Sequence, residues 1–93
     1  MMIKELKEKI KEKYYETDKK SGELFLLSVL FEEIGELSEA VRKGEIRGIE
    51  EELADVLFMV LSLANYFDVK PEDVLIKKYI EEDPSKNWDL PKA

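Results

Sequence analysis

Two short runs of acidic residues are the part of this sequence best suited to chemistry. Glu33 and Glu36 form one pair, and Glu52 and Asp55 form the other, each with an i,i+3 spacing. On a helix, this spacing places both members on the same side. Two facing helices would therefore direct four carboxylates into a shared space. Oxygen ligands without histidine or cysteine suit Mg²⁺, so the pattern predicts a magnesium site with these four residues as ligands.

The setting of these acids strengthens the prediction. Both pairs interrupt apolar helical stripes, where a carboxylate is costly unless a cation compensates it. No lysine or arginine falls on the same stripes. The rest of the first stripe consists of Leu26, Val29, Leu30, Leu37 and Ala40. Chance placement of acids on highly charged helices is the alternative explanation.

Other carboxylate-rich sites fit the sequence less well. A di-iron bundle normally needs Glu-x-x-His motifs, and the chain contains no histidine. No loop carries the alternating Asp and Asn ligands of an EF-hand. Glu32 lies beside the first pair, at i,i+4 from Glu36. We expect Glu32 at the rim of the site. It would act there as an extra ligand or general base, or it is an ordinary solvated acid.

Helical spacing of apolar residues predicts four helices and no strand. Gly44 is expected to end the second helix, and Pro71 to open the fourth. A break is expected at residues 17–20, with Ser21 as the N-cap of the second helix. The predicted helices cover residues 2–16, 21–43, 49–67 and 71–82. They form a single domain, residues 1–93, with a core at about 14–80 and an irregular tail at 84–93.

Composition limits the classes of partner. The net charge of −7 argues against nucleic acids and anionic membranes. Charged residues at the start argue against a signal peptide, and the longest apolar run is too short to span a bilayer. The chain also contains no cysteine, which fits a reducing compartment. We therefore expect a cytoplasmic protein. Residues 25–31 and 56–58 are apolar nearly all round the helix, which predicts burial on several faces in a homodimer or homotetramer.

The sequence also resembles a known family. The runs Leu30-Phe31-Glu32-Glu33-Ile34-Gly35-Glu36-Leu37-Ser38-Glu39-Ala40 and Glu51-Glu52-Leu53-Ala54-Asp55-Val56-Leu57 are similar to the MazG-like nucleotide pyrophosphohydrolases of the all-alpha NTP pyrophosphatase superfamily. The resemblance covers roughly residues 14–80. It implies an oligomeric four-helix bundle whose metal-binding and catalytic residues are Glu33, Glu36, Glu52 and Asp55.

The resemblance also implies a reaction. Such enzymes use Mg²⁺, with Mn²⁺ as a possible substitute, to cleave NTPs or dNTPs into monophosphate and pyrophosphate, in nucleotide-pool housekeeping. Lys77 and Lys78 are the candidate phosphate contacts, or else ordinary solvated lysines. The chain departs from relatives that place an Asn and an Arg after such a lysine, because Glu82 and Ser85 stand there.

Three residues of the tail and two other functions are further candidates. Lys86 and Asn87 are substitute phosphate contacts, and Trp88 is a candidate for stacking on the base. One alternative function is a non-catalytic regulatory module that binds nucleotide or metal. The other is a structural oligomerisation module with solvated acids.

Overall fold

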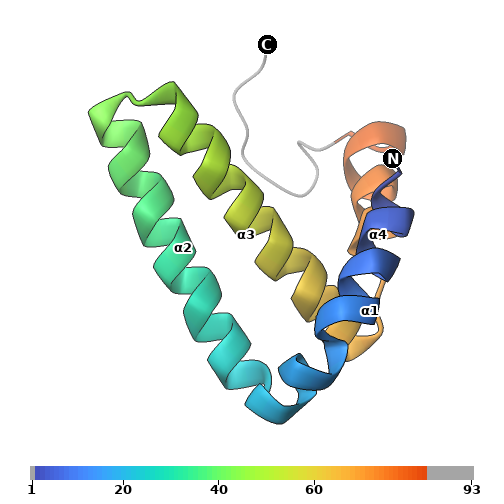
Figure 1. Cartoon of the computed structure of the whole chain (residues 1–93). Helices are drawn as coiled ribbons and strands as arrows, with labels where there is room; N and C mark the ends of the chain where they lie inside the picture. Colours follow the sequence, from blue (N-terminus) through green and yellow to red (C-terminus); the bar gives the residue numbers. More distant parts are fainter. Residues whose placement is uncertain (1, 84–93) are drawn as a thin grey trace.

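The computed structural model describes residues 2–83, and these form an all-helical fold without strands (Figure 1). None of the helices in this part of the chain is both long and apolar enough to cross a bilayer. The elements are α1 (Ile3–Ser21), α2 (Glu23–Lys43), α3 (Ile46–Phe67), α4 (Pro71–Ile76) and the π-helical turn η1 (Lys77–Glu81).

The hairpin of α2 and α3 is the frame on which the acidic pairs lie. The two helices run antiparallel and side by side in Figure 1. Gly44 ends α2 in the left-handed conformation, with φ of 69°, and its N–H donates to the carbonyl oxygens of Ala40 and Val41. Glycine enters this conformation without steric cost, which confirms the predicted stop.

The predicted break at residues 17–20 is wrong. α1 continues through this stretch to Ser21, whose hydroxyl donates to the carbonyl oxygen of Thr17 instead of capping the next helix. Polar residues alone do not end a helix, and Lys19 and Lys20 suit the negative end of its dipole. The chain turns at Gly22, where φ is 89°.

Two other boundaries also differ from prediction. α3 begins at Ile46, so Gly48 lies inside its first turn and not before the helix. The fourth helix begins at Pro71 as predicted, but the α-helical part ends at Ile76 and the rest of the segment is π-helical.

α3 is the central element, with α2 on one side and α1 on the other. The buried apolar side chains of the described residues are Leu26, Met59, Leu61 and Ala64. Tyr14 of α1 makes an edge-to-face contact with Phe58 of α3, with ring centroids 5.1 Å apart. Packing against both neighbours explains why α3 is the most apolar helix.

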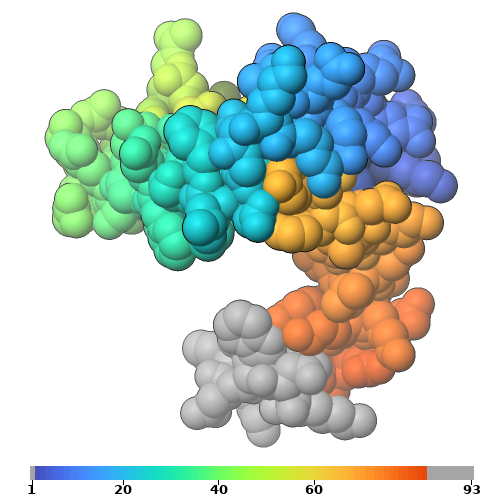
Figure 2. All heavy atoms as spheres, turned by 90° about the horizontal axis from the view of Figure 1, so that it is seen from below, coloured from blue at the N-terminus to red at the C-terminus, as the bar shows by residue number. Residues whose placement is uncertain are grey.

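One buried lysine joins α1 to the end of α3 and the start of α4. The Lys7 ammonium donates to the Val69 carbonyl oxygen at 3.1 Å and to both Glu72 carboxylate oxygens at 3.0 and 2.9 Å. Asn65 returns a hydrogen bond to the Lys7 carbonyl oxygen at 2.9 Å. We call these four residues the Lys7 junction. Beyond it, α4 and η1 project from the body formed by α1–α3 (Figure 2).

Candidate metal centre

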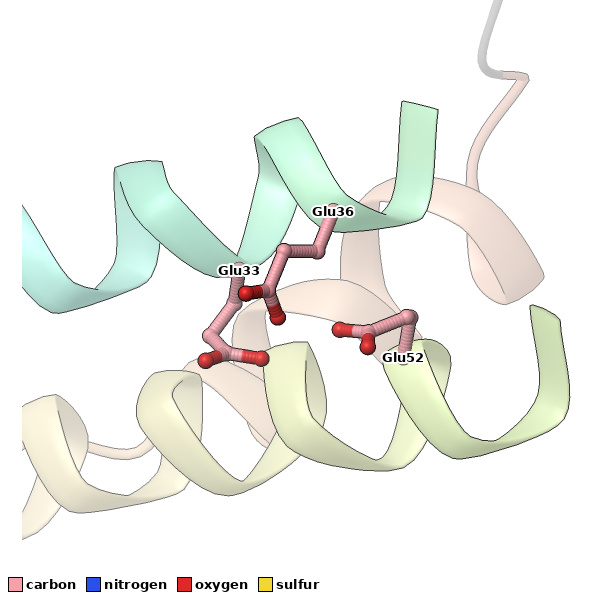
Figure 3. A group of neighbouring side chains, drawn as sticks. All are labelled: Glu33, Glu36 and Glu52. Atoms are coloured by element: carbon pink, nitrogen blue, oxygen red, sulfur yellow. The ribbon is translucent and has the colours of Figure 1, made fainter. Parts of the chain in front are cut away.

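Three acids converge across the α2–α3 hairpin. Glu33 and Glu36 extend from α2 toward Glu52 on α3 (Figure 3). One carboxylate oxygen from each lies within 4.8 Å of the other two. We call these three residues the acidic cluster. The arrangement confirms that the i,i+3 pair on α2 and the first acid of the α3 pair face a common space.

Part of this acidic cluster is shielded from water without receiving a partner. Glu33 and Glu52 are half-buried, and one oxygen of each, Oε2 in both cases, is buried without a hydrogen bond. Within residues 2–83, no lysine or arginine forms an ion pair with any of the three acids. Unpaired buried carboxylate oxygens are costly, so the geometry suits a bound cation.

The pKa values of Glu33 and Glu52 reflect the burial and close approach of the carboxylates in the acidic cluster. Burial is the largest cause that raises the pKa of Glu33, to about 7. A hydrogen bond to Glu52, which only protonated Glu33 can donate, raises it further, and the neighbouring carboxylate charges add to both effects. Burial also raises the pKa of Glu52, although the hydrogen bond with Glu33 opposes that rise. A divalent cation would reverse this preference for protonation.

The other two predicted site residues, Asp55 and Glu32, are not members of the acidic cluster. Asp55 is exposed on α3, one turn after Glu52, and its charge raises the pKa of both Glu33 and Glu52. Its oxygens are not among those gathered within 4.8 Å. Glu32 is exposed on α2 and lies outside the acidic cluster. The ligand role of Asp55 and the role of Glu32 therefore stay predictions.

The two predicted phosphate contacts on η1 lie elsewhere in the chain. Lys77 and Lys78 are on η1, and the Lys78 ammonium is 5.7 Å from the centroid of the Tyr79 ring. Lys78 lines a hollow with apolar residues of the α3–α4 connection and α4, separate from the acids. Lys86, Asn87 and Trp88 lie outside the described residues.

A polar hollow of about 320 Å³ adjoins the acidic cluster near the turn of the hairpin. We call it the hairpin hollow. Among residues 2–83, one lysine lines it: Lys43, which the sequence analysis did not predict and whose ammonium is 3.2 Å from Glu39. The hydrogen bond to Glu39 is the largest cause of a raised pKa for Lys43. The available signal was its position seven residues after Glu36. The lining residues are Glu36, Glu39, Ala40, Lys43, Glu45, Gly48 and Glu52.

The donor set tests whether a magnesium ion suits this centre. The acidic cluster offers several carboxylate oxygens and no nitrogen or sulfur ligand, which matches a hard cation. Glu36 is exposed and the hairpin hollow lies beside it, so water and an anionic ligand can reach the centre. The residues therefore fit a solvent-accessible Mg²⁺ site.

The sequence matches the model of a known protein family. The family model of the MazG nucleotide pyrophosphohydrolase domain matches residues 21–86, which is more than half of the chain. The matched region contains the whole acidic cluster, Asp55 and Lys43. No curated protein matches the sequence.

Proposed function

Since this chain belongs to the MazG nucleotide pyrophosphohydrolase domain family, we propose that it is a Mg²⁺-dependent nucleoside triphosphate pyrophosphohydrolase. Its reaction converts an NTP or dNTP and water into the monophosphate and pyrophosphate. The observation that carries the proposal is the convergence of Glu33, Glu36 and Glu52 with two buried oxygens that have no partner. The role that we propose is the removal of noncanonical or excess nucleotides.

We assign the metal to the acidic cluster, with Asp55 as a fourth ligand from the next turn of α3. Bound Mg²⁺, or Mn²⁺ in its place, would neutralise phosphate charge and lower the pKa of the attacking water. The half-buried Glu33 and Glu52 fix the inner side of the site. The exposed Glu36 and Asp55 form the side that meets solvent and substrate.

The reaction itself needs a proton acceptor near the water. Water attacks the α-phosphorus, its oxygen forms the new bond, and the bond to the bridging oxygen of the β-phosphate breaks, so that pyrophosphate leaves. Glu32 is our candidate acceptor of the water's proton, because it adjoins Glu33 in the sequence and is exposed. Glu32 as an additional ligand is the other assignment of this residue.

We propose that two or four copies of the chain assemble. Large apolar side chains are exposed on the outer faces of the protomer, among them Leu24 at 78%, Phe31 at 64% and Ile80 at 74%. A second copy packed on these faces would remove them from water, which is favourable. Light scattering at micromolar concentration tests this, and a monomer would refute it.

Product analysis tests the proposed reaction. The protein is incubated with canonical and modified NTPs and dNTPs, in Mg²⁺ or in EDTA, and the phosphorus products are identified by NMR. We expect monophosphate and pyrophosphate in Mg²⁺ and neither product in EDTA. Release of inorganic phosphate instead would contradict the assigned reaction.

One observation favours a second candidate function, a regulatory module that binds nucleotide without turning it over. Lys77 and Lys78 do not line the hairpin hollow, so neither supplies a positive charge there within the protomer. Tight binding of a Mg²⁺–nucleotide complex, without release of pyrophosphate from any substrate, would select this candidate.

A further inference from the structure

The hairpin hollow continues the acidic cluster toward the turn between α2 and α3. Glu36 and Glu52 belong to both, so the two spaces are contiguous. Along α2 the order is Glu33, Glu36 and then Lys43, with Lys43 about 10 Å beyond Glu36 along the helix axis. A polyanion that is bound at the acidic cluster can therefore extend into the hairpin hollow and approach Lys43.

Within the part of the chain that the structure describes, Lys43 is the single cation that lines the hairpin hollow. It lies seven positions after Glu36, which is nearly two helical turns, so both side chains leave the same side of α2. The other charged linings are carboxylates, and they would repel a phosphate chain. Among the described residues that line the hollow, only Lys43 can offset that repulsion.

The present partner of Lys43 holds it weakly. Its ion pair with Glu39 is an i,i+4 pair on the surface of one helix, and the two side chains are 57% and 58% exposed. Pairs of this kind contribute little to stability. The ammonium is carried on a flexible four-carbon stem, so it can leave Glu39 for a phosphate at small cost.

We propose that Lys43 binds the terminal phosphates of the nucleotide, the part that leaves as pyrophosphate, inside the hairpin hollow. This inference rests on the proposed function. It also orients the substrate along the hairpin: the phosphate tail lies toward the α2–α3 turn, and the nucleoside lies on the other side of the acidic cluster.

The test compares Lys43→Met with Arg42→Met, a matched loss of positive charge at the neighbouring position. Arg42 is exposed, contacts Ser38 and does not line the hairpin hollow. Binding of inorganic pyrophosphate in saturating Mg²⁺ is measured by calorimetry, together with KM and kcat for an NTP. We expect Lys43→Met to weaken pyrophosphate binding and raise KM by about ten-fold or more, as for a lost bond between charged groups. Arg42→Met should leave both unchanged, and Lys43→Arg should restore most of the affinity.

Two outcomes separate this inference from the proposed function. If Lys43→Met binds pyrophosphate as tightly as the original protein while hydrolysis proceeds, the role of Lys43 is overturned and the proposed function stands. If the original protein releases no pyrophosphate from any nucleotide, the proposed function itself fails, and the role of Lys43 falls with it. A purely structural lysine would lower the melting temperature without changing either binding value.

Discussion

Buried charged groups near the two ends of α3 differ in whether they have partners of opposite charge. Near its end, Asn65 and the following segment take part in the Lys7 junction, where the ammonium has three acceptor oxygens and Glu72 has its cation. Near its start, Glu52 meets two more carboxylates, and one oxygen each of Glu33 and Glu52 has no partner. A closed network stabilises a fold by itself, whereas a set of neighbouring carboxylates repels itself until a proton or a cation neutralises part of its charge.

This difference indicates that the two regions have different roles. The Lys7 junction should be important for stability and unimportant for chemistry, and the acidic cluster should show the reverse. Substitutions in one region can therefore be judged against the other region of the same protein.

The largest expected effect is that of Glu33→Gln on activity. Losing this carboxylate should lower kcat/KM for pyrophosphate release by more than about 100-fold, because even outer partners of metal ligands can cost 10–100-fold. Helix content should stay the same, and the melting temperature of the metal-free protein should rise by a few degrees, since like-charge repulsion is relieved. Kinetic assays and circular dichroism measure the three quantities.

Glu50→Gln is the matched control for this variant. Glu50 is an exposed acid on α3 outside the acidic cluster, and its loss should leave activity unchanged. Full activity of Glu33→Gln would show that the acidic cluster is not the reaction centre.

Lys7→Met should affect stability. The substitution leaves the largely buried Glu72 carboxylate and the Val69 carbonyl without their donor, with side-chain exposures of 10% for Lys7 and 14% for Glu72. We expect the free energy of unfolding to fall by about 3 kcal/mol, at the lower end of the cost of breaking a buried pair. Urea denaturation measures it, with Lys4→Met as the exposed control on the same helix.

Activity per folded molecule should change little in Lys7→Met. A large loss of kcat in fully folded Lys7→Met would mean that the two regions are coupled, and that the Lys7 junction does not act on stability alone.

The pH dependence of stability distinguishes the regions by sign. The pKa of Glu33, about 7, is raised above the ordinary value of 4.5, so the folded metal-free protein binds a proton that the unfolded chain lacks. Its stability should therefore increase as pH falls from about 7 toward 4.5. The hydrogen bond from Lys7 lowers the pKa of Glu72, and the stability that this provides is present above about pH 4.5 and lost as pH falls further.

Urea midpoints measured in EDTA across pH should therefore show a maximum near about pH 5. Glu33→Gln should remove the rise on the neutral side, and Glu72→Gln should reduce the fall on the acid side. Identical profiles for the original protein and Glu33→Gln would remove the evidence for crowded carboxylates.

Local signals in the sequence predicted most of the fold. Gly44 and Pro71 act through their own backbone preferences. The end of α2 and the start of α4 could therefore be predicted from these two residues. The helix break predicted at residues 17–20 was wrong because polar residues are compatible with both helix and turn. The chain turns only at Gly22.

The convergence of the three acids was predictable for a similar reason, whereas their role as a site stays a prediction. The i,i+3 spacing of Glu33 and Glu36 is a local property, and it correctly placed both on the face toward α3. Contacts between distant residues have no such signal. Lys7 looks like any surface lysine until its partner Glu72, 65 residues away, is known. The separation of Lys78 from the acids likewise depends on how α4 packs.

Calorimetric titration of Mg²⁺ into the metal-free protein and into Glu33→Gln tests the central claim most directly. We predict that the original protein binds Mg²⁺ and, at about pH 6.5, releases a proton, because the metal displaces the proton held by Glu33 and its neighbours. Proton release should disappear at about pH 8.5, and Glu33→Gln should bind at least about ten-fold more weakly. Equal binding by the two proteins, or no binding by either, would contradict the assignment of the acidic cluster as a metal site.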